Sequence, residues 1–319
     1  AVFALTGTYS GTDKDSAASL KATIAEINAN GGVRGHRLVY RIVDSASDPA
    51  KAALAAQQVV DQYKPHVMIP DIVCIMALSA LPIANRAGIV TFTGCDNGVP
   101  SNPSLNPRNF STFPPVAVLG VPLVAAAQRV MRGRKMSIGF LHSNDAAGNA
   151  MVLRVRLATE LKGHKWVGDQ PFTVGTPDLS VQLSRLRQAG ADVVILWGQV
   201  GDAGNTMKSV RDLAWDVQVI GGTGTTSATL VNEIPEDLRD NFHALVTANS
   251  IRKAGSNAVP PWINTYLRRA DSSVQTLSVV GAVHDGLTLW KWAVERTKSV
   301  NPARVTAELE KLSTLPQAQ

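Results

Sequence analysis

Segments with the residue pattern of strands alternate with segments of helical period along almost the whole chain, and this alternation limits the possible folds more than any other feature. The predicted strands lie at 2–5, 38–43, 67–69, 90–92, 137–142, 166–172, 193–197 and 218–221. The predicted helices lie at 16–29, 49–62, 78–86, 120–131, 149–162, 179–188 and 203–214. Such alternation is typical of parallel sheets that carry helices on both faces. The sequence therefore predicts an α/β fold.

The chain is also too long for one core. Its 319 residues exceed the ~250 residues that a single hydrophobic core usually serves, so two lobes are expected. The two series of elements are separated by a Pro- and Asn-rich stretch, 97–107, and by the short apolar sequence Phe113-Pro114-Pro115. The lobes should therefore be closely hinged, and a cleft between them is the expected binding place.

Composition and charge exclude some classes of protein. No apolar run approaches the ~20 residues that span a bilayer as a helix. The net charge is +6, and the densest basic run, Arg129 to Lys135, lacks the interleaved aromatic residues of a nucleic-acid platform. We interpret this run as a solvated face and expect no nucleic-acid partner.

The stretch from Glu26 to Lys51 combines a helix stop, a tight turn, a strand and a new helix start. Gly31-Gly32 can end the preceding helix by adopting positive φ, and Asp48 and Pro49 offer a cap and a first-turn residue for the next helix. An N-x-x-G-G-V-x-G turn with an Asp-Pro pair at this distance resembles the type I periplasmic solute-binding proteins, especially their leucine/isoleucine/valine-binding branch.

The resemblance extends over essentially the whole chain. The segment Asp178 to Leu196 looks like the family's D-F-S-x-x-x-x-x-L-K segment, Gln218 to Gly224 looks like its strand-to-loop segment, and His284-Asp285 stands where the family usually has Tyr-Asp. The family's fold consists of two Rossmann-like lobes with parallel central sheets, joined by a multi-strand hinge. The resemblance thus implies a discontinuous first lobe, 1–115 plus 249–319, and a second lobe, 116–248.

The return of the chain to the first lobe is implied by the resemblance alone. A strand near 242–247 should leave the second lobe, and helices at 261–269 and 278–296 should pack back on the first. We interpret Trp290 and Trp292, on the second of these helices, as amphipathic packing rather than as a ligand platform.

Branched-chain amino-acid binders of this family hold the ligand carboxylate with hydroxyls and backbone amides that follow strands of the first lobe. The positions that match or adjoin these groups lie in loops after the predicted strands, at Tyr9, Ser10, Cys74, Ile75, Cys95, Asp96 and Asn97. A thiol is only a weak hydrogen-bond donor, so the side chains of this site are expected to be rebuilt. Peptide N–H groups at loop and helix starts could still hold an anion.

The family meets the ligand's ammonium group with tyrosines and a glutamate of the second lobe. The positions that match these groups are Gln199 or Val200, Thr223, and Ala147 before Gly148. Gly224, beside Thr223, and His284 on the late helix are further candidate contacts. None is acidic, and a buried ammonium without a carboxylate costs several kcal/mol. The predicted ligand is therefore an organic acid, aromatic or branched, rather than an α-amino acid. Asp96 or Asp145 could supply the missing charge, or could be ordinary turn residues.

The remaining reactive residues support neither a metal site nor an enzyme. Cys74 and Cys95 follow neighbouring predicted strands and are either a disulfide or two buried thiols. No two of the six histidines have the i, i+4 spacing of a zinc helix. Gly222-x-Gly224-x-x-Ser227 imitates a dinucleotide fingerprint but lacks its third glycine, and neither a nucleophile elbow nor a P-loop is present. We expect no catalytic residue, metal or cofactor.

The predicted function is the solute-binding component of an ABC importer. A monomer would close its lobes on a small organic solute and present the closed form to the membrane permease. The resemblance implies a periplasmic or other extracytoplasmic location, and Ala1 begins inside a strand, as in a mature export form. The family normally continues with further strands after the position of Gln319, so a further C-terminal portion is expected. The alternatives are a branched-chain or other amino-acid binder of the same transporter class, an amide- or urea-type sensor, and, in a different class, a Rossmann-like enzyme.

Overall fold

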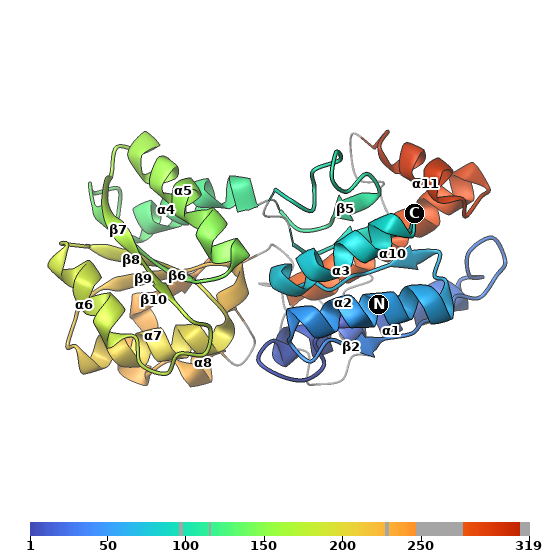
Figure 1. Ribbon diagram of the computed structural model, residues 1–319. Coiled ribbons are helices and arrows are strands. Elements are labelled where there is room, and N and C mark those ends of the chain that lie inside the picture. The colour runs from blue at the N-terminus through green and yellow to red at the C-terminus, as the bar shows by residue number, and fades with distance from the viewer. Residues whose placement is uncertain (96–97, 115, 227–229, 247–276, 313–319) are drawn as a thin grey trace. The chain divides into compact units, whose positions relative to one another are not determined.

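A computed structural model describes residues 1–95, 98–114, 116–226, 230–246 and 277–312 (Figure 1). Its Cα positions group into two compact units, of which unit 1 comprises Ala1–Phe113 with Arg252–Gln319 and unit 2 comprises Pro114–Ile251. Every strand pairing recorded between the named strands is parallel. The prediction of an α/β fold with parallel sheets is confirmed.

Unit 1 is built on short parallel strands. They are β1 (Val2–Phe3), β2 (Val43–Asp44), β3 (Val67–Met68), β4 (Val90–Thr93) and β5 (Asn109–Ser111). β1 pairs with β2, and β4 lies between β3 and β5. A bridge between Val2 and Pro70, and a hydrogen bond from the N–H of Val2 to the carbonyl of Ile69 (3.0 Å), join the two groups of strands.

Two sets of helices cover this sheet. The helices of unit 1 are α1 (Ser10–Ala29), α2 (Pro49–Gln58), α3 (Cys74–Arg86), α10 (Leu277–Thr297) and α11 (Pro302–Leu309), and a π-helical turn, η1 (Val59–Tyr63), continues α2. Successive strand residues point to opposite faces, so Phe3 packs with α1, α10 and α11, whereas Val2 packs with α2 and α3. The late helix α10 thus shares its core with the first strand and helix, as expected. Trp290 is buried in that core and Trp292 packs at its edge.

The predicted relay after α1 is largely confirmed. α1 ends where Gly31 and Gly32 adopt φ of +89° and +74°, and the N–H of Gly32 donates to the carbonyl of Ile27 (2.8 Å). A side chain at Gly32 would meet the backbone oxygen of His36, since an added Cβ would lie 2.1 Å from it. Asp48 caps α2 by accepting from the N–H of Lys51 (2.9 Å), and Pro49 is the first helical residue.

The strand predicted at 38–43 is wrong over most of its length, because β2 comprises only Val43–Asp44. The Asn28 side chain forms hydrogen bonds with both backbone groups of Leu38. Its Nδ2 donates to the carbonyl of Leu38 (3.0 Å), and its Oδ1 accepts from the N–H of Leu38 (2.7 Å). Val39 is exposed. This segment therefore satisfies its polar groups locally instead of extending the ladder.

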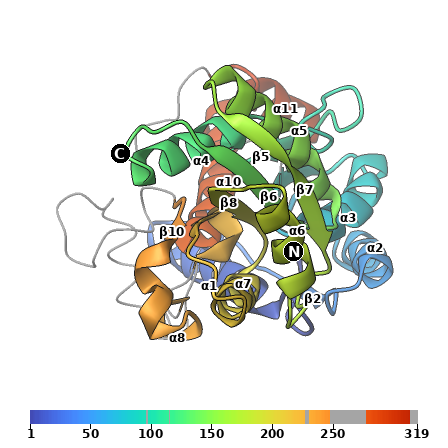
Figure 2. The same cartoon turned by 90° about the vertical axis from the view of Figure 1, so that its left-hand side faces the viewer.

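Unit 2 holds a five-stranded parallel sheet in the order β10-β9-β8-β6-β7 (Figure 2). The strands are β6 (Ser137–Ser143), β7 (Lys165–Phe172), β8 (Val193–Trp197), β9 (Gln218–Gly221) and β10 (Phe242–Ala244). The helices are α4 (Val116–Val130), α5 (Ala146–Leu161), α6 (Ser180–Gln188), α7 (Val200–Asp212) and α8 (Leu230–Glu233), with 3-10 turns η2 (Thr223–Thr225) and η3 (Glu236–Asn241). Apolar residues of α4 and α5 pack on one face of the sheet and those of α6 and α7 on the other.

Several helices begin earlier than predicted. α1 starts at Ser10 rather than Ser16, α3 at Cys74 rather than Leu78, α5 at Ala146 rather than Asn149, and α7 at Val200 rather than Ala203. The predicted helix at 261–269 and the end of the strand predicted at 242–247 lie outside the described residues. Among the helices that are described, none is long and apolar enough to cross a membrane.

Candidate functional site

The candidate residues of unit 1 stand at the first turns of two helices, each of which follows a parallel strand. Tyr9 is the N-cap residue of α1 and Ser10 its first residue, while Cys74 and Ile75 open α3 after the N-cap residue Val73. They were predicted to lie in loops, and the structure corrects this. The first N–H groups of a helix have no partner within the helix. At α1 the N–H groups of Tyr9 and Ser10 already donate, to Ser47 Oγ (3.1 Å) and to the carbonyl of Gly7 (3.2 Å).

A disulfide joins the first turn of α3 to the end of β4. Cys74 and Cys95 are bonded, with their Cα atoms 5.0 Å apart. Thr93, the last residue of β4, donates its hydroxyl to the carbonyl of Cys95 (3.2 Å). The segment that leads from β4 toward the candidate positions Asp96 and Asn97 is thereby tied to α3, although Asp96 and Asn97 themselves lie outside the described residues.

Two buried carboxyl groups lie near these helix starts: Asp13 is in the first turn of α1, and Asp71 precedes the N-cap residue of α3. Asp71 Oδ1 accepts from the N–H of Val73 (2.8 Å), and Asp13 Oδ2 accepts from the N–H of Ala4 (2.7 Å). Burial raises the pKa of Asp13 to about 6, and burial together with the neighbouring Asp13 carboxyl raises the pKa of Asp71 well above its usual value. The pair therefore links the end of β1 to the start of α3 through carboxyl groups that keep their protons to a higher pH than an exposed aspartate does.

His284 lies in the first half of α10, and its Nδ1 is 3.1 Å from Oδ1 of the adjacent Asp285. The helix is anchored on either side of it. The carbonyl of Val280 accepts from the hydroxyl of Ser19 on α1 (2.7 Å), and Gly286 packs on Phe92 of β4 so closely that an added Cβ would lie 2.9 Å from the Phe92 Cβ. α10 is thus anchored to α1 and to β4 on either side of His284.

In unit 2, Ala147 occupies the first turn of α5. The N-cap residue Asp145 accepts through Oδ1 from the N–H groups of Ala147 (3.0 Å) and Gly148 (2.8 Å). Gly148 must be small, because an added Cβ would lie 1.9 Å from the backbone oxygen of Ser143. Asp145 is therefore a helix cap, which was one of the two roles considered for it.

The remaining candidates of unit 2 gather where β8 and β9 end. Gln199 is the N-cap residue and Val200 the first residue of α7, and Thr223 and Gly224 form the turn η2 after β9. An added Cβ on Gly224 would lie 2.6 Å from the backbone oxygen of Gly198, so the turn packs directly beside the start of α7. The structure thus brings these four residues together.

Asp202 is a residue of this region that sequence reasoning missed. It is buried, its Oδ2 accepts from the N–H of Gln199 (2.7 Å), and its Oδ1 accepts from the N–H of Gly175 (2.8 Å). Burial raises its pKa, and the charge of Asp145 acts in the same direction. The signal was a capping box, with an acidic residue three positions after the N-cap residue, and it was overlooked because the helix was expected to begin at Ala203.

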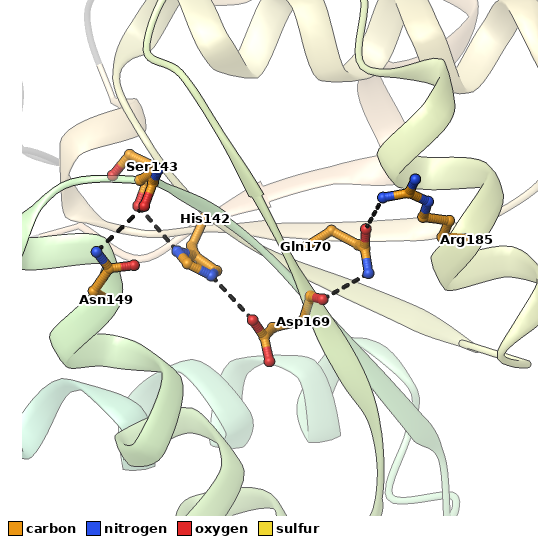
Figure 3. A network of polar contacts seen from close by, with 7 residues as sticks. His142, Ser143, Asn149, Asp169, Gln170 and Arg185 are labelled. Atoms are coloured by element: carbon orange, nitrogen blue, oxygen red, sulfur yellow. Dashed lines mark hydrogen bonds and ion pairs between the residues drawn. The ribbon is translucent and has the colours of Figure 1, made fainter.

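A polar network holds the end of β6, the strand that precedes α5 (Figure 3). The buried ring of His142 lies with Nδ1 2.9 Å from the carbonyl of Ser143 and Nε2 3.2 Å from Asp169 Oδ2 on β7. Gln170 Nε2 donates to the carbonyl of Asp169 (2.7 Å), and Arg185 on α6 donates to Gln170 Oε1 (3.3 Å). The strand end from which α5 departs is therefore held to β7 and α6.

No group of three or more potential metal-ligating side chains is found among residues 1–95, 98–114, 116–226, 230–246 and 277–312. The arrangement that is present consists of helix N-termini that follow parallel strands. Asp145 accepts from first-turn N–H groups of α5, and the buried Asp71 and Asp202 accept from the N–H groups of the N-cap residues Val73 and Gln199. Such termini favour a negatively charged group.

A family model described as "Periplasmic binding protein" matches residues 1–318. A "Leu/Ile/Val-binding protein homolog 3" of Brucella melitensis is 23% identical over 288 residues, which are 83% of this chain and 77% of that protein. An "Amino acid binding protein" of Pseudomonas aeruginosa is 23% identical over 209 residues, 64% of this chain and 54% of its own length. The chain thus spans little more than half of the second relative.

Solved structures resemble the chain over nearly its full length. The branched-chain amino acid transporter substrate binding protein LivJ of Streptococcus pneumoniae, in complex with isoleucine, has a TM-score of 0.79 at 16% identity and covers 97% of this chain and 86% of its own. A solute binding protein of an ABC transporter from Rhodopseudomonas palustris BisB5, in complex with 3,4-dihydroxy benzoic acid, has a TM-score of 0.78 at 20% identity and covers 96% and 83%. At these identities the likeness concerns the fold.

Proposed function

Since the family model spans residues 1–318, the chain belongs to the periplasmic binding protein family, in the leucine/isoleucine/valine-binding-like branch of type I, and we propose that it is the solute-binding component of an ABC importer. The proposed ligand is a small organic acid. The proposed location is the periplasm or another extracytoplasmic space, and the proposed partner is the transporter's membrane permease.

One observation carries this proposal: most of the candidate positions, in both units, lie at helix N-termini that follow parallel strands. α5 and α7 in unit 2 begin three residues after the ends of β6 and β8, and α3 and α1 in unit 1 begin six and seven residues after the ends of β3 and β1. Ligands of open parallel sheets bind outside the carboxyl ends of the strands, and helix N-termini favour anions there. A carboxylate is thus the chemical group that this arrangement suits best.

The carboxylate is also what the named ligands of similar proteins share. Isoleucine and 3,4-dihydroxybenzoic acid both carry one, and only isoleucine carries an ammonium group as well. In unit 2, Asp145 and Asp202 accept hydrogen bonds from backbone N–H groups, and Asp202 is buried. We infer that they serve α5 and α7 rather than a ligand ammonium, which supports an acid without that group.

The names of the relatives favour the alternative, an amino-acid ligand, because they include Leu/Ile/Val-binding proteins. A thermal-shift screen separates the two. The protein is unfolded in guanidinium, dialysed to remove carried-through ligand and refolded, and then titrated with leucine, valine, 4-hydroxybenzoate, 3,4-dihydroxybenzoate and branched aliphatic acids. At a hundredfold excess over Kd, a ligand adds about 2.7 kcal/mol to the free energy of unfolding.

We expect the acids without an ammonium group to raise the melting temperature. A rise with α-amino acids alone would refute the organic-acid assignment and leave solute binding intact, whereas nucleotide binding or turnover would favour a Rossmann-like enzyme. Small-angle X-ray scattering with and without a bound acid tests closure of the two units, for which a smaller radius of gyration is expected.

A matched pair of variants tests the placement of the ligand. Ser10→Ala removes a hydroxyl at the first turn of α1, and Ser137→Ala removes one at the beginning of β6. The first variant should weaken binding about tenfold, since one hydrogen bond to a charged group contributes roughly 1.5 kcal/mol. The second should not alter it, and equal effects would contradict this placement of the site.

A further inference from the structure

A second surface of unit 2 lies away from the strand ends described above, where β6 and β7 begin. α4 leads into this region through 131–135, and α5 leads into it through 162–164. Ser137 and Lys165 are paired across the two strands, and the N–H of Lys165 donates to the carbonyl of Met136 (3.0 Å). The ends of the two helices are therefore neighbours.

Basic side chains crowd this edge, and all of them are exposed. They are Arg129, Arg132, Arg134, Lys135, Lys162 and Lys165. Within the described part of the chain, no carboxylate lies within 4.0 Å of any of the six to form an ion pair. The pKa of His164 is lowered by its burial and then by the charges of Lys135 and Lys162, so these two lysines act on the same ring.

Carboxylates in the neighbourhood are already engaged. Glu160 pairs with Arg156 on the same helix (2.9 Å). Asp192 lies at the same edge of the sheet, where its Oδ2 accepts from the N–H of Ser137 (2.7 Å). The six cations therefore leave a local excess of positive charge.

Apolar side chains are exposed beside these cations. On α5, Leu153, Leu157 and Leu161 are 54%, 41% and 82% exposed, and their i, i+4, i+8 spacing aligns them on one stripe. α4 runs beside α5 in both views (Figures 1 and 2), and an added Cβ at Gly120 would lie 2.4 Å from the backbone oxygen of Arg154. The leucine stripe thus ends among the cations, at Leu161 and Lys162.

We propose that this basic–leucine surface, made of the six cations with Leu157 and Leu161, binds an anionic lipid bilayer. The cations would lie against lipid phosphates and the leucines would enter the boundary between headgroups and acyl chains, as in helices that lie in the membrane plane. Each Lys or Arg near such a surface adds to the attraction, and salt screens it.

Charge complementarity favours this occupant over others. A second copy of the chain would bring six unpaired cations against six more. An acidic protein or a nucleic acid would neutralise the cations, but binding either of them would give the exposed leucines no role. A bilayer surface offers both anionic groups for the cations and an apolar layer for the leucines. The surface would hold the protein beside a membrane independently of any ligand.

Flotation with lipid vesicles tests the proposal on the full chain. The probes are vesicles of phosphatidylcholine alone and vesicles with one third phosphatidylglycerol, at low salt and at about 0.5 M salt, where screening acts within a few ångströms. We expect binding to the anionic vesicles only, with a loss of at least tenfold at high salt. Absence of binding at low salt, or equal binding to both vesicles, would overturn it.

Two triple variants with the same change in net charge localise the binding. Arg132→Gln/Lys135→Gln/Lys162→Gln alters the surface, and Lys14→Gln/Lys21→Gln/Lys51→Gln removes three exposed charges from unit 1. The first should weaken binding at least tenfold and the second less than twofold. Equal losses would mean that only net charge matters, and would refute the surface.

Leu161→Asn tests the apolar half. Because this side chain is exposed, circular dichroism should show unchanged folding, and partitioning into anionic vesicles should fall severalfold. Unchanged partitioning would refute leucine insertion. Binding of an acidic peptide such as polyglutamate with no vesicle binding would reassign the surface to a protein partner and overturn the proposal.

Discussion

Breaking the disulfide between Cys74 and Cys95 should destabilise unit 1 and leave unit 2 unchanged. The two residues are 21 positions apart in the sequence. Closing a loop of this length in the unfolded chain removes conformational entropy, and the chain-entropy relation gives about 3 kcal/mol at 25 °C. With a urea dependence of about 2 kcal/mol per molar, the unfolding midpoint of unit 1 should fall by about 1.5 M.

Urea titrations of the oxidised protein, the dithiothreitol-reduced protein and the double variant Cys74→Ala/Cys95→Ala measure this effect. Hydrogen exchange, followed on peptides of each unit, assigns the loss to unit 1. Dithiothreitol should not move the midpoint of the double variant, which serves as the control. The reasoning fails if reduction shifts unit 1 by less than about 0.3 M, an effect below 1 kcal/mol, or if the unfolded oxidised protein contains two titratable thiols.

Two further effects follow from buried groups. Gly148→Ala should destabilise unit 2 by more than 2 kcal/mol, a typical cost of overpacking, because its Cβ would lie 1.9 Å from the oxygen of Ser143; Gly201→Ala, at the start of α7 with nothing within 4 Å, is the control in thermal unfolding and should cost nothing. The raised folded-state pKa of Asp13, about 6, means that the folded protein holds a proton that the unfolded chain releases near pH 4. The contribution of protonated Asp13 to the free energy of unfolding is therefore complete below about pH 4 and is lost as the pH rises through 6. Asp13→Asn should flatten the decline of stability between these values in urea titrations, and a decline as steep as in the unaltered protein would contradict the assignment.

Much of the fold was predictable because its signals are local. β8 and β9 have the predicted bounds, since buried parallel strands are short apolar runs with turn residues on both sides. The Gly31-Gly32 stop and the Asp48 cap were predictable for the same reason. The segment 38–42 was not, because the side chain of Asn28, ten residues earlier than Leu38, takes the place of a neighbouring strand.

The candidate site was harder to predict because its geometry depends on where helices begin. Apolar periodicity identifies the middle of a helix, whereas first turns such as Cys74-Ile75 and Val200 contain residues that a loop could equally hold. Asp13, Asp71 and Asp202 were missed because a buried carboxyl group looks like a surface one in sequence. Whether the candidate residues contact a ligand stays a prediction.

Trp290 packs in the same core as Phe3 and Ile27, so this core can be completed only after almost the whole chain has been synthesised. During synthesis, all of unit 2 is made before α10, the helix that packs against Ile27. The interval between Ile27 and Trp290 is 290 − 27 = 263 positions, or roughly 13 to 50 s at 5–20 residues per second. For that time the part of the apolar face of α1 that α10 covers stays exposed, whereas Phe3, Ile69 and Phe92 of the same core have already been synthesised.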